Sequence, residues 1–141
     1  ILLTLPGIPF VYYGEEIGMK GVKPDEYIRT PMQWTGGANA GFSTASPWIA
    51  PNSNYTSFNV ENQVSDENSI LNTYKNLIHT RNEEVALRRG DYQPVSSSTQ
   101  RVLAFTREYE GETILVLINT SPQAANSIRL VSARHSHPRA C

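Results

Sequence analysis

Two adjacent glutamates, Glu15 and Glu16, follow a short apolar run that is rich in aromatic residues. The run from Ile8 to Tyr13 lacks the alternation of a half-buried strand, so we expect a strand covered on both faces, as in parallel sheets. Ligands of α/β proteins lie beyond the carboxyl ends of such strands, where carboxylates can act as acids, bases or nucleophiles. Glu15 and Glu16 therefore stand where an α/β enzyme keeps its reactive groups.

These two glutamates cannot both face one ligand if the strand continues through them, because successive side chains of a strand point to opposite faces. Tyr12 and Tyr13 should alternate across the strand for the same reason. We expect one glutamate to accept backbone hydrogen bonds from the following loop, and the other to pair with a cation such as Arg29.

The elements that would position these residues begin with the end of a helix. Ile1 to Leu5 could close a helix that Pro6 and Gly7 terminate. The segment from Gly14 to about Val64 is rich in Gly, Pro, Asn and Ser and is far longer than structureless loops of about 12–15 residues. Such a loop is usually functional or contains short elements.

A helix from about Glu67 to Asn82 is predicted by apolar residues at helical spacing, with Ser65 and Asp66 as N-cap candidates. After it the periodicity changes. Residues 101–107 and 113–118 are predicted strands joined by the hairpin turn "EYEGE", and residues 128–131 are a candidate third strand. The change from an αβ part to an all-β part falls near residues 87–91.

Composition limits the classes of partner. The chain has 141 residues, 39% of them hydrophobic, and a net charge of −1, which suits one domain or two small ones. There is no basic excess for nucleic acid or for an anionic membrane, and no apolar run is long enough to span a bilayer. The single cysteine, Cys141, excludes an intramolecular disulfide. The chain begins inside a helical pattern without a visible signal peptide, so we expect a fragment and favour the cytoplasm without deciding the location.

The tail "ARHSHPRAC" shows neither the helical nor the strand spacing of apolar residues. His135 and His137 could bind a metal from one face of a strand. We favour a disordered or foreign tail over residues 133–141, and therefore expect no metal site.

Three motifs occur in order: "YYGEEIGM" at residues 12–19, "IRTPMQW" at residues 28–34 and "NAGFS" at residues 39–43. Together they resemble the α-amylase superfamily of glycoside hydrolases, in its α-glucosidase and oligo-1,6-glucosidase branch. The resemblance extends over about residues 1–121. It implies a (β/α)₈ TIM barrel followed by an antiparallel all-β domain, of which this chain would be an α/β fragment.

On that resemblance, residues 1–86 are the last βα unit of the catalytic barrel with its long top-face loop. Residues 87–132 begin the C-terminal β domain. An isolated barrel strand would leave two open edges, so a fragment that folds alone is expected either to pack in a non-native way or to self-associate.

The resemblance also implies roles for single residues. The catalytic carboxylates of the family lie on earlier barrel strands, so none is matched in this chain. Arg29 of "IRTPMQW" is implied to help close the sugar pocket, and a guanidinium can bind paired hydroxyls. Trp34 and Phe42 could stack on sugar rings, as could Trp48, although such aromatics are often anchors of a loop core. No cofactor is implied.

Three functions stay open. In the first, the chain is a fragment of a retaining hydrolase acting on α-glucosidic bonds of starch-, maltose- or isomaltose-type saccharides. It could instead be a stand-alone carbohydrate-binding or interaction domain. Thirdly, it could be a miniature amylase in which Glu15 or Glu16 forms a carboxylate dyad with Asp25 or Glu26. Its substrate partner would be an α-linked oligosaccharide or glucoside, and the linkage preference is not encoded in these residues.

Overall fold

The computed structural model describes residues 1–132; the tail at 133–141, with His135 and His137, lies outside them. The chain divides into two compact units. Within the described residues, we call residues 10–79 the loop unit, and residues 1–9 together with residues 80–132 the sheet unit. Helix α2 (Ile70–Glu83) begins in the first and ends in the second. No helix in the described part combines the length and apolar character needed to cross a membrane.

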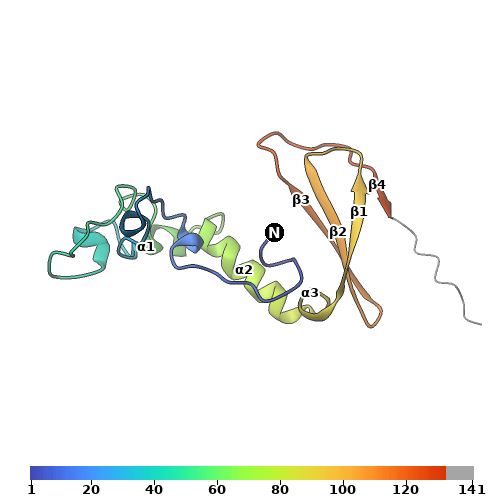
Figure 1. Cartoon of the computed structure of the whole chain (residues 1–141), viewed down its shortest axis with the longest axis horizontal. Coiled ribbons are helices and arrows are strands. Elements are labelled where there is room, and N and C mark those ends of the chain that lie inside the picture. The colour runs from blue at the N-terminus through green and yellow to red at the C-terminus, as the bar shows by residue number, and fades with distance from the viewer. Residues whose placement is uncertain (133–141) are drawn as a thin grey trace, which may run out of the picture. The chain divides into compact units, whose positions relative to one another are not determined.

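The sheet unit contains an antiparallel sheet of four strands in the order β3-β2-β1-β4 (Figure 1). The strands are β1 (Asp91–Ser97), β2 (Val102–Tyr109), β3 (Glu112–Asn119) and β4 (Leu130–Ser132). The two strands expected at residues 101–107 and 113–118 are confirmed as β2 and β3. They meet at Glu110 and Gly111, whose φ angles of 46° and 91° suit a two-residue hairpin turn of type I′.

Strand β1 was not predicted, because it carries a proline within a serine-rich stretch. Pro94 lies opposite Phe105 of β2. On the side of β1 away from β2, β4 pairs only with Val95 to Ser97. Within the described residues, Pro94 therefore has no strand partner on that side. A proline without an N–H is tolerated at such an edge. The expected third strand at residues 128–131 corresponds to β4, which begins two residues later and ends one residue later.

Two buried arginines organise the core of the sheet unit beside Phe105 and Leu87. Arg81 donates to the carbonyl oxygens of Leu3, Leu5 and Gly7, at 3.0, 3.2 and 2.6 Å. Arg107 donates to the carbonyl oxygen of Thr4 at 2.8 Å. The expected helix end at residues 1–5 is a single turn, in which Leu5 N–H donates to the Ile1 carbonyl at 3.2 Å. Its last carbonyls have no partner within the turn, and the guanidinium groups supply one.

The long segment of the loop unit contains short elements, as expected. They are three 3₁₀ turns and one short helix: η1 (Glu15–Ile17), η2 (Asp25–Ile28), η3 (Ala38–Gly41) and α1 (Val60–Val64). Buried side-chain amides hold these elements together. Gln63 Nε2 donates to the Ile17 carbonyl at 2.8 Å, while its Oε1 accepts from Leu71 N–H at 3.0 Å.

The expected strand from Ile8 to Tyr13 is wrong. The segment has no strand pairing, and Ile8 and Phe10 are each 83% exposed. The rings of Tyr12 and Tyr13 lie side by side, with centroids 4.8 Å apart, instead of on opposite faces. A strand needs hydrogen-bonded neighbours, and within residues 1–132 the four strands of the sheet unit pair only with their neighbours in that sheet.

The helix expected from Glu67 to Asn82 is confirmed with a shifted start, since α2 runs from Ile70 to Glu83. Neither Ser65 nor Asp66 caps it. The Asp66 carboxylate accepts from Asn68 N–H and forms a tight turn, whereas Ser69 Oγ accepts from Asn72 N–H at 3.1 Å. Ser69 is thus the residue that caps the helix, by the geometry of a side-chain N-cap.

Candidate functional site

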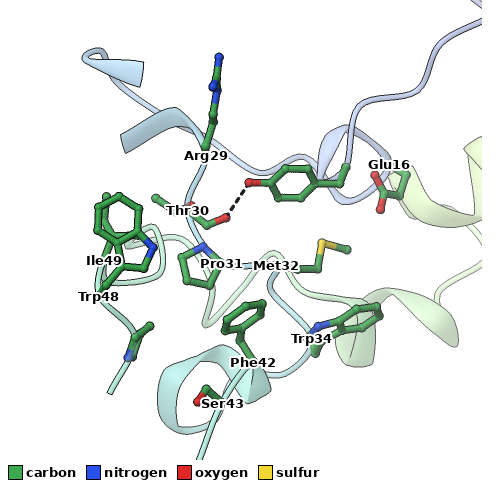
Figure 2. Close-up of a pocket in the computed structure, with 12 residues that line it drawn as sticks. Glu16, Arg29, Thr30, Pro31, Met32, Trp34, Phe42, Ser43, Trp48 and Ile49 are labelled. Carbon is green, nitrogen blue, oxygen red and sulfur yellow. Dashed lines mark hydrogen bonds between the residues drawn. The ribbon is translucent and has the colours of Figure 1, made fainter. Parts of the chain in front are cut away.

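The loop unit contains a pocket of about 520 Å³ (Figure 2). Its walls come mainly from the "IRTPMQW" segment, the residues around "NAGFS" and the stretch just after it. It is lined by Tyr13, Glu16, Arg29, Thr30, Pro31, Met32, Trp34, Phe42, Ser43, Pro47, Trp48 and Ile49.

The three residues expected to bind substrate all line this one pocket. Arg29 follows η2 directly as its C-cap, and Phe42 follows η3 directly as its C-cap. Trp34 lies between them in the sequence, and Trp48 completes the aromatic set. Figure 2 shows the rings of Trp34, Phe42 and Trp48 spread along the pocket, while the Arg29 side chain extends away from them.

A tight reversal of the backbone brings Trp34 and Phe42 together. The N–H groups of Trp34 and Thr35 both donate to the Ala40 carbonyl, at 2.9 and 3.0 Å. Asn39 and Ala40 adopt left-handed φ angles of 51° and 55°. An asparagine tolerates this conformation well. Its side chain also donates to the carbonyls of Ser43 and Ala45, at 3.0 and 3.1 Å, which fixes the chain after Phe42.

A hydrogen bond from Tyr13 fixes the start of the "IRTPMQW" segment. The Tyr13 hydroxyl donates to the Thr30 carbonyl at 3.1 Å, as the dashed line in Figure 2 shows. Burial, followed by the neighbouring Tyr12, raises the pKa of Tyr13, so the hydroxyl keeps its proton at neutral pH and can donate. This contact was not predictable from the sequence, because the expected strand would have placed Tyr12 and Tyr13 on opposite faces.

The charged residues of the pocket are bound to other parts of the chain. Glu16 Oε2 accepts from Gly14 N–H at 2.8 Å, as expected for one of the two glutamates. Arg29 Nη2 lies 3.3 Å from Asp25 Oδ2. The expected pairing of Arg29 with a glutamate is therefore corrected to a pairing with Asp25, which also lies 3.4 Å from Lys23.

The remaining carboxylates lie outside the pocket lining. Glu15 is exposed on η1, and Glu26 is exposed on η2. Burial raises the pKa of Tyr74 on α2, and the charges of Glu15 and then Glu16 raise it further. The charges of both glutamates therefore act on Tyr74 of α2, and of the two only Glu16 also lines the pocket.

Two family models match the chain. One is described as the catalytic domain of alpha amylase and matches residues 1–90. The other is described as the C-terminal domain of maltogenic amylase and matches residues 92–130.

Individual proteins of known name are also similar to this chain. Alpha-amylase 3 of Dictyoglomus thermophilum is 44% identical over 121 residues, which cover 84% of this chain and 24% of the relative. An oligo-1,6-glucosidase of Halalkalibacterium halodurans is 31% identical, over 84% of this chain and 28% of the relative. The crystal structure of a trehalulose synthase from Pseudomonas mesoacidophila MX-45 superposes with a TM-score of 0.77 at 33% identity, over 84% of this chain and 28% of that one. The chain spans about a quarter of the length of these relatives.

Proposed function

The chain belongs to the α-amylase family, and from this premise we propose that it supplies part of the substrate-binding wall of an enzyme that cleaves or transfers α-glucosidic bonds. Its relatives include glycoside hydrolases and transferases of that family, which by their names act on α-glucosidic saccharides. The family implies a TIM barrel followed by a C-terminal β domain, and the antiparallel sheet of the sheet unit is consistent with a part of the latter.

We assign residues 1–86 to the last βα unit of the barrel and its top-face loop. The segment at residues 8–13 would be the eighth barrel strand, completed by pairing with neighbouring barrel strands of a longer protein. The exposure of its apolar side chains supports this assignment, because a barrel strand that is separated from its neighbouring strands leaves its apolar faces uncovered. Residues 87–132 would be the start of the β domain.

The observation that carries the proposal is the convergence of Arg29, Trp34 and Phe42 on one pocket. Two separate motifs supply these side chains. An aromatic wall suits the apolar faces of a saccharide ring, and the Arg29 guanidinium, which extends away from that wall, can bind paired hydroxyls at the margin of the pocket. Arg29 is held by Asp25 in an exposed pair, which costs little to rearrange when a ligand offers hydroxyl oxygens.

The bond-breaking carboxylates of the enzyme would come from other barrel strands. A retaining glycosidase needs two carboxyl groups about 5–5.5 Å apart, one as nucleophile and one as proton donor. Among the described residues, Glu16 Oε2 accepts from a backbone N–H and Asp25 lies beside two cations, so both carboxylates already have partners within the chain. The miniature-amylase alternative has less support than substrate binding.

Binding and hydrolysis by the chain itself test the proposal. Tryptophan fluorescence titrated with maltose and isomaltose should show saturable binding, and Arg29→Ala should weaken it by on the order of tenfold. Arg101→Ala is the matched control, since Arg101 is an exposed arginine of the other unit. Hydrolysis of maltose should be absent.

Two results would count against the proposal. Equal affinities in the Arg29 variant and the wild type would remove Arg29 from the site. Hydrolysis that disappears in Glu15→Gln or Glu16→Gln, with an unchanged circular dichroism spectrum, would establish the miniature amylase instead. Saccharide binding by a chain whose encoding DNA has no upstream catalytic domain would favour the stand-alone binding module. A longer reading frame upstream would argue against that module.

A further inference from the structure

Strand β3 forms one edge of the four-stranded sheet, and β4 forms the other edge (Figure 1). On its inner side β3 pairs with β2 over its whole length, from Glu112 to Asn119. Within residues 1–132, no strand and no backbone hydrogen bond engages the other side of β3. The N–H and C=O groups that point outward from β3 are therefore open to a further strand.

The hairpin turn determines which groups of β3 point outward. In a two-residue turn the flanking pair exchanges both ladder hydrogen bonds, and such pairs then alternate along the strands. The flanking pair here is Tyr109 and Glu112. Counted from this pair, Thr113, Leu115 and Leu117 belong to pairs without ladder hydrogen bonds, so their backbone groups point to the free edge. The side chains of Leu115 and Leu117 are also each 47% exposed.

This free edge lacks the features by which edge strands usually avoid another chain. Residues 113–119 contain no charged residue, no proline and no glycine. The register with β2 runs without a bulge from Glu112 to Asn119. Charges, prolines and bulges are the common means of preventing two edge strands from pairing. The outer side of β3 is therefore competent to pair with a strand of another molecule.

The sequence of the edge is a palindrome. Residues 114–118 read Ile-Leu-Val-Leu-Ile in both directions, and Thr113 and Asn119 are the polar ends. Two antiparallel copies related by a twofold axis at Val116 place each of these apolar residues opposite one of its own kind. The polar ends also lie opposite each other. Glu112, the one charged residue of β3, lies opposite a threonine of the second copy, so no like charges meet.

We propose that two copies of the chain pair antiparallel through this edge, with Val116 on the twofold axis. The two four-stranded sheets then form one continuous sheet. Leu115 of one copy packs against Leu117 of the second copy, which buries side chains that are half exposed in the single chain. The outer edges of the joined sheet are the two β4 strands, Leu130–Ser132. Because these are short, the assembly ends at two copies.

Sedimentation velocity over a concentration series measures the association, and the wild type should show an equilibrium between monomer and dimer. In the double variant Leu115→Lys/Leu117→Lys, each new lysine lies opposite a lysine of the second copy. The dissociation constant of the dimer should therefore rise by at least about tenfold. The control Val64→Lys/Val131→Lys adds the same charge at two exposed valines outside β3. Its dissociation constant should stay within about threefold of the wild type.

A variant of opposite charge tests whether the lysines act across the interface. Leu115→Glu/Leu117→Glu should also dissociate when it is alone in solution. Mixed with the lysine variant, it should form a mixed dimer that is at least about tenfold tighter than either variant with itself, since each glutamate then lies opposite a lysine. Circular dichroism establishes that each variant is folded.

Disulfide cross-linking tests the register. Cys141, the only cysteine of the sequence, is first replaced by serine. In the proposed pairing the two copies of residue 116 face each other without ladder hydrogen bonds, at a Cα separation of about 4.5 Å, which a disulfide can span. Val116→Cys should therefore cross-link in oxidised glutathione. Ile114→Cys, at a similarly exposed position of the same strand face, lies four residues from its own copy and should not cross-link.

Several results would overturn this interface. The wild type could remain monomeric at about 0.1 mM, or form species larger than a dimer. The lysine variant could dimerise as tightly as the wild type, which would place the contact elsewhere, such as at the exposed segment of residues 8–13. Equal cross-linking of the two cysteine variants would exclude the twofold axis at Val116. None of these results bears on the proposed function, because the candidate pocket lies in the loop unit.

Discussion

The guanidinium of Arg107 is bound to the carbonyl oxygen of Gly90, with Nη2 at 2.8 Å and Nε at 3.3 Å. Nη1 of the same side chain reaches the Thr4 carbonyl. Arg107 is 1% exposed, and burial, followed by repulsion from Arg81, lowers its pKa. The charge is therefore held by oriented backbone carbonyls at the end of α3 (Val85–Arg89) and in the first turn of the chain.

Arg107→Met should destabilise the sheet unit by about 3 kcal/mol or more. The change removes three charged hydrogen bonds and leaves two carbonyls without their donor, at about 1.5–3 kcal/mol for each hydrogen bond to a charged group. Urea unfolding followed by circular dichroism measures the loss. Arg101→Met, at an exposed arginine, should stay within about 0.5 kcal/mol of the wild type. Similar midpoints for the two variants would contradict a structural role for Arg107.

Gly90→Ala should also destabilise this unit, by at least about 1 kcal/mol, through crowding of the backbone that Arg107 binds. A Cβ at residue 90 would lie 2.5 Å from the Ala86 carbonyl oxygen and 2.9 Å from that of Glu108. Neither backbone atom can rotate away. Gly36→Ala is the control, since a Cβ there meets no atom closer than 3.5 Å. Thermal unfolding of the two variants compares them, and a wild-type melting temperature for Gly90→Ala would refute the expected clash.

Gln63→Leu should loosen the start of α2. The substitution keeps a similar volume but leaves the buried Ile17 carbonyl and the Leu71 N–H unpaired, at about 1–3 kcal/mol each. Amide hydrogen exchange measured at Leu71 should accelerate by on the order of tenfold, because its acceptor is lost. Exchange at residues of β2 serves as the internal reference. Unchanged protection of Leu71 would show that another group takes over the hydrogen bond.

Glu84→Gln should change the pH dependence of stability. A hydrogen bond with Glu112, followed by burial and by repulsion from Glu112 and Glu83, raises the pKa of Glu84 above its ordinary value of 4.5. Folding thus favours the protonated form, so the stabilisation is present at pH below about 4.5 and is lost as the pH rises through the raised pKa. Glutamine mimics the protonated acid and should retain this stabilisation at neutral pH.

Thermal unfolding between pH 4 and pH 8 compares Glu84→Gln with the wild type and with Glu61→Gln, which removes the same charge at an exposed glutamate of the loop unit. The difference from the wild type should grow with pH for Glu84→Gln and stay constant for Glu61→Gln. A constant difference for both variants would exclude a shared proton between Glu84 and Glu112.

The sequence by itself determined the hairpin of β2 and β3 and helix α2, and its motifs singled out Arg29, Trp34 and Phe42, which line one pocket. The hairpin of β2 and β3 follows from two β-branched, apolar runs around Gly111, and α2 follows from apolar residues at helical spacing. Arg29, Trp34 and Phe42 were recognised from short motifs. These features depend on residues within a few positions of one another, where periodicity and turn chemistry act directly.

Tertiary structure alone decided which groups bind one another. The hydroxyl of Tyr13 meets the carbonyl of Thr30, 17 residues away, and Arg107 meets Thr4 across 103 residues. Arg29 pairs with Asp25 instead of with Glu15 or Glu16, because η2 places Asp25 one turn before it. The apolar segment at residues 8–13 predicts a strand, yet a strand exists only when neighbouring strands accept and donate its backbone hydrogen bonds, a condition that no local pattern encodes.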